Sequence, residues 1–145
     1  MPEIIKIETA KLAKEKDFDE PVVSFFENGN EALLSDGNAS NINSVYWKVE
    51  GTSEWYSAPT QSELQKWLRD KHNILVSPIT AFSQQFIEDR LVFTFKPCIE
   101  KLISVGENLF YREIQYEMFH GLEPMGYEQA FELALYEGLK LIEVK

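Results

Sequence analysis

The chain has 145 residues but one cysteine, two histidines and no long hydrophobic run. The single cysteine, Cys98, excludes an intrachain disulfide bond and fits a reducing compartment. No stretch approaches the roughly 18 consecutive apolar residues that a membrane span needs. Residues 1–20 alternate charge too often to contain the apolar core of a secretion signal. We therefore expect a cytoplasmic protein without a membrane partner.

Residues that bind metals or perform catalysis are few and widely separated. His72, His120 and Cys98 stand far apart, and no C-x-x-C, H-E-x-x-H or D-x-D-x-D-G pattern is present. The chain also has no P-loop, no G-x-S-x-G and no G-x-G-x-x-G. The sequence predicts no catalytic residue, no cofactor and no metal. A dyad of Cys98 with a histidine stays open as an alternative.

Basic residues are outnumbered, with 14 against 24 acidic residues and a net charge of −10. Phosphate binding needs clustered lysine and arginine, so no nucleic-acid partner is predicted. Residues 102–145 hold eight acidic and three basic residues, which would attract a partner with a basic surface. Glu128, Glu132 and Glu143 are predicted to lie on the outer side of a helix.

Apolar residues make up 44 % of the chain and aromatic residues 13 %, enough for a well-buried core. The pattern predicts a single α+β domain over residues 1–145. Its largely antiparallel sheet has about four to six strands, covered on one face by about three helices. The predicted helices are 5–16, 60–73 and 127–142, and the predicted strands are 22–26, 31–35, 45–49, 74–79, 91–95, 98–105 and 114–118. Residues 50–57 and 80–90 are predicted to be irregular, with one helical turn allowed at 83–90, and Pro97 is predicted to interrupt a strand.

The stretch "APTQSELQKWLRDKHNI", residues 58–74, has the clearest helix signals. Thr60 and Glu63 form a T-x-x-E capping box, and Asn73 suits the left-handed conformation that ends a helix. The helix should bury Leu64, Trp67 and Leu68, which stand at i, i+3 and i+4. Lys71 and His72 should place positive charge in the last turn, where it suits the helix dipole.

The opposite side of this helix is a candidate interaction strip. At 100° per residue, Ser62, Lys66 and Arg69 lie together, with Gln65 beside them. An ordinary solvated helix face is the simpler explanation, because nearly every amphipathic helix has such a side, and two basic residues are too few for binding a phosphate backbone.

Trp47, Trp55 and Tyr56 bracket a segment with weak secondary-structure signals and are candidate contact residues. Tryptophan and tyrosine are enriched in the parts of interfaces that contribute most to binding. The alternative is that they cover the core above the start of the 60–73 helix.

In the last predicted helix, Ala130, Ala134 and Gly138 follow one another at steps of four. Small residues let a helix axis approach what it packs on, so this stripe is predicted to lie against the sheet. A functional groove is the alternative for the same stripe.

Three blocks, residues 8–21, 57–74 and 127–142, resemble a family of small uncharacterised proteins encoded by phages and prophages of gut anaerobic bacteria. The resemblance includes the A-P-T-Q-S-x-L-Q-K-W-L-R helix and a C-terminal helix that begins Y-E-x-A. It implies a phage or prophage setting and the order of the elements, and it carries no activity, cofactor or catalytic residue.

These observations favour a non-enzymatic accessory protein that works through contacts with a protein partner or with itself. Two alternatives stay open. The chain could be an acidic inhibitor that imitates nucleic acid, which requires the acidic residues of 107–143 to share one face. It could also be an enzyme with a nonstandard site, which requires a pocket containing a histidine or Cys98.

Overall fold

The computed structural model describes residues 3–34, 37–44, 54–80, 85–87, 90–92, 95–106, 109–114 and 126–143. The helices are α1 (Ile7–Glu15), α2 (Gln61–His72) and α3 (Tyr127–Lys140). The strands are β1 (Ser24–Glu27), β2 (Asn30–Leu33), β3 (Trp55–Ser57), β4 (Ile74–Thr80), β5 (Gln85–Ile87), β6 (Arg90–Val92), β7 (Phe95–Gly106) and β8 (Leu109–Ile114). The predicted α+β class is confirmed.

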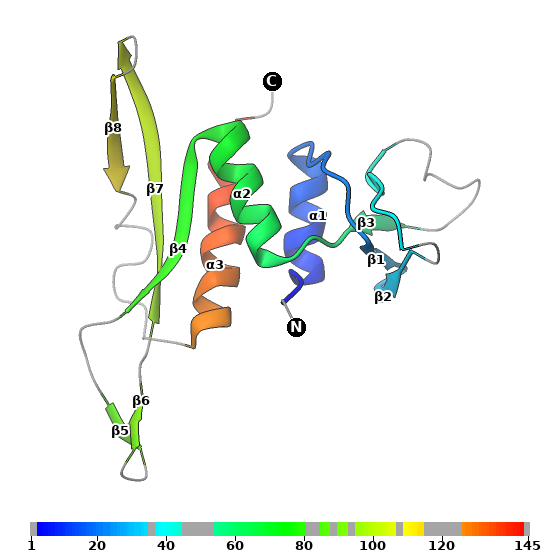
Figure 1. Cartoon of the computed structure of the whole chain (residues 1–145), viewed down its shortest axis with the longest axis horizontal. Helices are drawn as coiled ribbons and strands as arrows, with labels where there is room; N and C mark the ends of the chain where they lie inside the picture. The colour runs from blue at the N-terminus through cyan, green and yellow to red at the C-terminus, as the bar shows by residue number, and fades with distance from the viewer. Residues whose placement is uncertain are drawn as a thin grey trace.

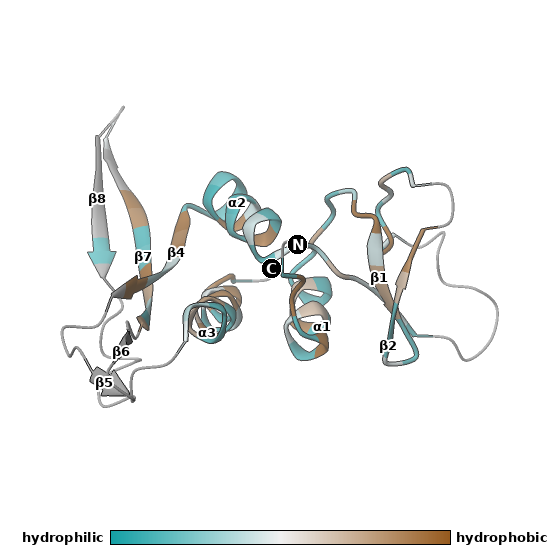
Figure 2. Ribbon diagram, turned by 60° about the horizontal axis from the view of Figure 1, so that its bottom comes forward, coloured by the Kyte–Doolittle hydropathy of each residue, from teal (hydrophilic) through white to brown (hydrophobic). Residues whose placement is uncertain are grey.

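The helices lie between two separate sheets (Figures 1 and 2). In the described residues, three strands pair in the order β2-β1-β3, three in the order β4-β7-β8, and β5 pairs with β6 alone. Every pairing is antiparallel. Within the described residues no sheet has more than three strands, so the sheet is smaller than the predicted four to six strands. Hairpin signals specify neighbouring strands but not which hairpins share a sheet.

Two proline residues lie directly opposite each other in β4 and β7, as the pair Pro78 and Pro97. The N–H of Leu102 donates to the carbonyl oxygen of Asn73 at 2.8 Å. Bonded and non-bonded pairs alternate along an antiparallel ladder, so the proline pair is one that exchanges no hydrogen bonds. The proline pair therefore costs no hydrogen bond between β4 and β7. Pro97 lies within the continuous strand β7, so the predicted strand interruption at Pro97 is wrong.

The β1–β2 hairpin turns at Asn28 and Gly29, whose φ angles are 50° and 87°. Two positive φ angles are those of a type I′ turn, which the pair was predicted to form. The prediction of an irregular segment at 50–57 is wrong at its end, because β3 pairs with β1 and aligns Trp55 with Glu27. Aromatic residues favour strands once a partner strand is present, and the partner lies far away in sequence.

Helix α2 begins and ends where the sequence predicts. The N–H of Glu63 donates to the Thr60 hydroxyl at 3.1 Å, and the N–H of Thr60 donates to the Glu63 carboxylate at 2.9 Å. Asn73 ends the helix with φ 57° and ψ 32°, and the buried side contains Leu64, along with Trp67 and Leu68.

Replacing Thr60 with alanine is expected to lower the free energy of unfolding by about 1 kcal/mol, because the Glu63 N–H loses its acceptor. Urea denaturation followed by circular dichroism measures this loss. Ser62→Ala is the matched control, because Ser62 is exposed one residue inside the same helix. Equal stabilities of the two variants would contradict the capping box.

The stripe of small residues on α3 lies against the sheet, as predicted. Ala130 and Ala134 are fully buried, and Gly138 is buried with them. A Cβ atom built on Gly138 would lie 2.8 Å from Cγ1 of Val76 in β4. Real Cβ atoms essentially never come so close to another heavy atom, so glycine at this position sets the distance between α3 and the sheet.

Several predicted elements differ from the structure or fall outside the described residues. The helical turn allowed at 83–90 is wrong, because residues 85–87 form a strand. The predicted strand 45–49 lies outside the described residues, as does 114–118 apart from Ile114.

Candidate functional site

The least expected feature is a buried carboxylate where the three helices meet. Glu132 of α3 is only 8 % exposed. Its Oε2 atom accepts hydrogen bonds from the backbone N–H of Lys6, at 3.1 Å, and from the Thr9 hydroxyl. Its Oε1 atom accepts from the Gln61 side chain at 3.2 Å. The prediction that Glu132 lies on the outer side of its helix is wrong.

The buried carboxylate compensates for a missing side-chain cap at the start of α1. The residue that precedes α1 is Lys6, which provides no side-chain cap, so the donors of the first turn lack a local acceptor. Glu132 supplies an acceptor and a negative charge from another helix, at the end of α1 where the dipole favours an anion. Gln61, the first residue of α2, also donates to the carbonyl oxygen of Glu128 at 3.0 Å. The Glu132 side chain thus links α1 and α2 to α3 by hydrogen bonds.

Sequence reasoning missed this site, although a signal was present. Glu132 precedes Leu135 by three residues and Leu139 by seven, so it belongs to the buried side of α3. A depression of about 350 Å³ between α1 and α3 is lined by Thr9, Glu132 and Tyr136 among others. The three donors already on Glu132 leave its carboxylate engaged in holding the helices together.

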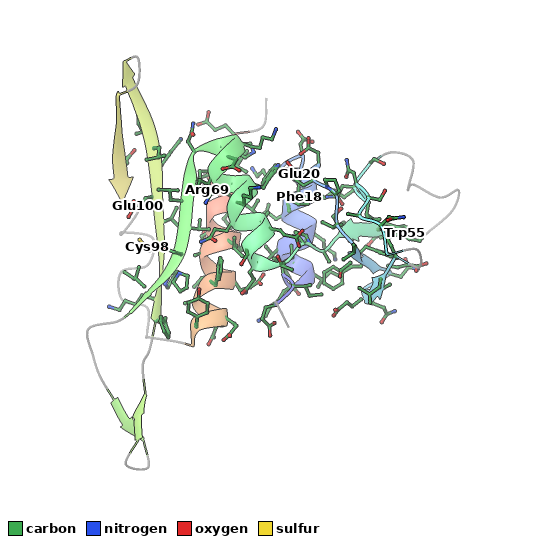
Figure 3. The ribbon with its side chains drawn as sticks, in the orientation of Figure 1. Phe18, Glu20, Trp55, Arg69, Cys98 and Glu100 are labelled. Carbon is green, nitrogen blue, oxygen red and sulfur yellow. The ribbon has the colours of Figure 1, made fainter. Side chains whose placement is uncertain are left out.

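Cys98, the cysteine singled out by the sequence, is buried in the fold. Cys98 lies in β7 opposite Ser77 of β4, and burial, together with the charge of Glu100, raises the pKa of its thiol. A raised pKa disfavours the nucleophilic thiolate. Cys98 and Glu100 sit at one end of the molecule and Trp55 at the other (Figure 3).

His72 packs edge-on against Trp67, with ring centroids 4.6 Å apart. Burial lowers the pKa of His72, and the charge of Asp19 acts in the opposite direction. His72 also lines a depression of about 420 Å³ together with Asp19 and Lys71, which is the kind of pocket that the enzyme alternative requires. His120, the other histidine, lies outside the described residues.

The four residues of the predicted interaction strip do not have the same surroundings. Ser62, Lys66 and Arg69 are exposed on one side of α2, and Arg69 pairs with the neighbouring Asp70 at 3.0 Å. Gln65 is half-buried and donates to the carbonyl oxygen of Val76 at 2.7 Å. Gln65 thus fastens α2 to β4, and the exposed strip consists of the other three residues.

Beside this strip lies a groove of about 410 Å³, which we call the α2 groove. Its walls come from α2 and from the connection between α1 and β1. Its lining residues include Glu20, Pro21, Lys66, Trp67 and Lys71.

The aromatic candidates pack against the core. Trp55 stacks on Phe25, with ring centroids 5.0 Å apart, and is half-buried. Lys11 and Lys14 hold their ammonium groups 5.8 and 5.1 Å from the centre of the Tyr56 ring. Burial raises the pKa of Tyr56, and the nearby Glu54 carboxylate raises it further. Trp47 lies outside the described residues.

The chain has no match among protein families, curated proteins or solved structures. No helix within the described residues combines the length and the apolar character needed to cross a membrane. Among those same residues, no group of three or more histidine, cysteine, aspartate or glutamate side chains is arranged to hold a metal ion.

Proposed function

We propose that this chain is a non-enzymatic, cytoplasmic accessory protein of phage or prophage origin that works by contacting another protein. The resemblance of the 57–74 block to phage and prophage proteins supports the setting. The contact surface in this proposal is the exposed strip of Ser62, Lys66 and Arg69 together with the α2 groove.

The observation that carries the proposal is the position of the α2 groove next to the strip. Lys66 belongs to both, so the strip and the groove form one continuous surface. The groove contains Trp67 and charged side chains of both signs, including Glu20 and Lys71. Trp67 forms the floor of the groove and is only 4 % exposed, so the charged side chains around it are the groups that would orient a protein partner.

Two of the groups that could perform chemistry are buried: Glu132 accepts three hydrogen bonds, and Cys98 lies in β7 with 8 % exposure. His72 packs on Trp67 and also lines a depression of about 420 Å³. The acidic-inhibitor alternative gains no support from α3, because Glu132 points into the protein while Glu128 is exposed.

Reversing two charges of the strip, Lys66→Glu with Arg69→Glu, is expected to weaken partner capture about tenfold or more, because both side chains are exposed at the contact surface. The measurement is affinity capture from lysates of gut anaerobic bacteria with immobilised wild type and variant, quantified by mass spectrometry. Lys11→Glu with Lys96→Glu is the matched control, because both lysines are exposed elsewhere and the change in net charge is identical.

A protein retained by the wild type and the control but lost by the Lys66/Arg69 variant would support the proposal. Identical captured sets for all three proteins would contradict it. Turnover of a substrate by the purified chain, lost on His72→Ala or Cys98→Ala, would contradict the non-enzymatic part.

A further inference from the structure

A second groove lies beside the start of α1, between residues 3–8 and the β1–β2 hairpin. Its volume is about 380 Å³, and we call it the hairpin groove. Ile4, Ile7 and Phe26 provide apolar surface: both isoleucines are half-buried and Phe26 is 7 % exposed. An apolar floor of this kind can bury aliphatic side chains of a ligand.

The rim of the hairpin groove is acidic. Glu3, Glu8 and Glu31 all line it and are all exposed, and the one basic side chain in the lining is the exposed Lys6. Glu31 comes from the hairpin, Glu3 from the N-terminal segment and Glu8 from the first turn of α1, so negative charge flanks the floor from both sides. A ligand that fits must combine apolar and positively charged groups.

The outer edge of β2 borders this groove. In the described part of the chain β2 is an edge strand, and Leu33 is 71 % exposed. The N–H of Leu34 donates to the carbonyl oxygen of Val23 at 2.8 Å, which directs the backbone groups of residue 34 toward β1. Backbone direction alternates along a strand, so the N–H and C=O groups of Glu31 and Leu33 point away from β1.

The alternation along the strands also decides which side chains share a face of the sheet. Glu31 pairs with Phe26 across the hairpin, so both side chains project from one face of the sheet, the face that lines the groove. A segment added alongside β2 would direct every second side chain over that face. Strand addition to an exposed edge is an established way for a domain to hold an extended peptide.

We propose that the hairpin groove binds an extended segment of a partner protein in which every second residue, the set that faces the groove, is aliphatic or basic. The segment adds to the edge of β2, its aliphatic side chains contact Ile4, Ile7 and Phe26, and its basic side chains lie near Glu3, Glu8 and Glu31. A second copy of this chain is a poor occupant, because two copies with a net charge of −10 repel each other. This inference rests on the proposed function of protein binding and assigns the chemistry of a partner.

The test is a fluorescence-anisotropy titration of the full chain with a labelled nine-residue peptide in which every second residue is isoleucine or lysine, in turn, and the residues between are threonine. Glu8→Lys with Glu31→Lys is expected to weaken binding about tenfold or more. Glu113→Lys with Glu128→Lys, which changes two exposed acidic residues elsewhere by the same charge, is expected to change it less than about twofold. A peptide N-methylated at alternate residues, on the bonding edge, should bind about tenfold more weakly because strand pairing is blocked.

Each variant is first checked for an unchanged thermal midpoint, and Glu3→Lys with Glu31→Lys replaces the first variant if Glu8→Lys destabilises α1. Equal weakening by both double variants would show general charge attraction and would overturn the inference. So would a dimer in sedimentation velocity that Glu8→Lys with Glu31→Lys dissociates, because the groove would then hold a second copy. If the peptide fails to bind while capture through Lys66 and Arg69 persists, this inference is overturned and the proposed function stands.

Discussion

Replacing Glu132 with alanine is expected to lower the free energy of unfolding by about 3 kcal/mol. The carboxylate is buried and accepts hydrogen bonds from the Lys6 N–H, the Thr9 hydroxyl and the Gln61 amide. Its removal leaves these donors without their acceptor and removes the negative charge at the start of α1. Urea denaturation followed by circular dichroism gives the change in stability.

The matched control is Glu128→Ala, one helical turn earlier and exposed. Its carbonyl oxygen, which accepts from Gln61, is kept in the variant. The control is expected to change stability by less than about 0.5 kcal/mol. Equal losses for the two variants would show that Glu132 matters only through general helix or charge effects, and would contradict its role as a tie between helices.

Gly138→Ala is expected to destabilise the fold by about 2 kcal/mol, although alanine is the better helix former. The added Cβ would lie 2.8 Å from Val76 Cγ1 and 3.6 Å from both Ile74 Cγ2 and Leu68 Cδ1. Val76 is buried and β-branched, so its side chain has few alternative rotamers, and either α3 or β4 must shift. The thermal midpoint of the variant measures the loss.

Gly126→Ala, at the N-cap of α3, is the control for adding a Cβ where it meets nothing within 4 Å. A second test uses Val76→Ala, which removes the clashing atom. In that background Gly138→Ala should be far less harmful, so the two substitutions together should be less destabilising than the sum of their separate effects. Strict additivity would contradict the close contact as the cause.

Features that depend on near neighbours were predictable from the sequence. Thr60 and Glu63 are three residues apart, and Asn73 adopts its left-handed conformation within its own helix end, so both limits of α2 follow from local chemistry. The turn at Asn28 and Gly29 follows in the same way from residues that accept positive φ. The prediction that the stripe of small residues on α3 is a packing surface was also correct, because close helix packing needs small side chains whatever the partner.

Features that depend on distant residues were not predictable. The strand at 55–57 exists because β1 lies beside it, and Pro97 is accommodated because its partner in β4 is Pro78. Glu132 was assigned to solvent because acidic residues are seldom buried unpaired, and its donors come from positions 6, 9 and 61. The register of paired strands and the hydrogen bonds between helices depend on the folded arrangement, which local sequence patterns do not specify.

The central structural claim is that Glu132 is held for folding, and the proposal of a binding function rests on it. A double-mutant cycle of Thr9→Val and Glu132→Ala, measured by urea unfolding, tests it most directly. We predict a coupling free energy of about 2 kcal/mol, because the hydroxyl and the carboxylate are buried partners. A coupling near zero, with Glu132→Ala as stable as the wild type, would contradict the claim, because functional carboxylates can often be replaced without loss of stability.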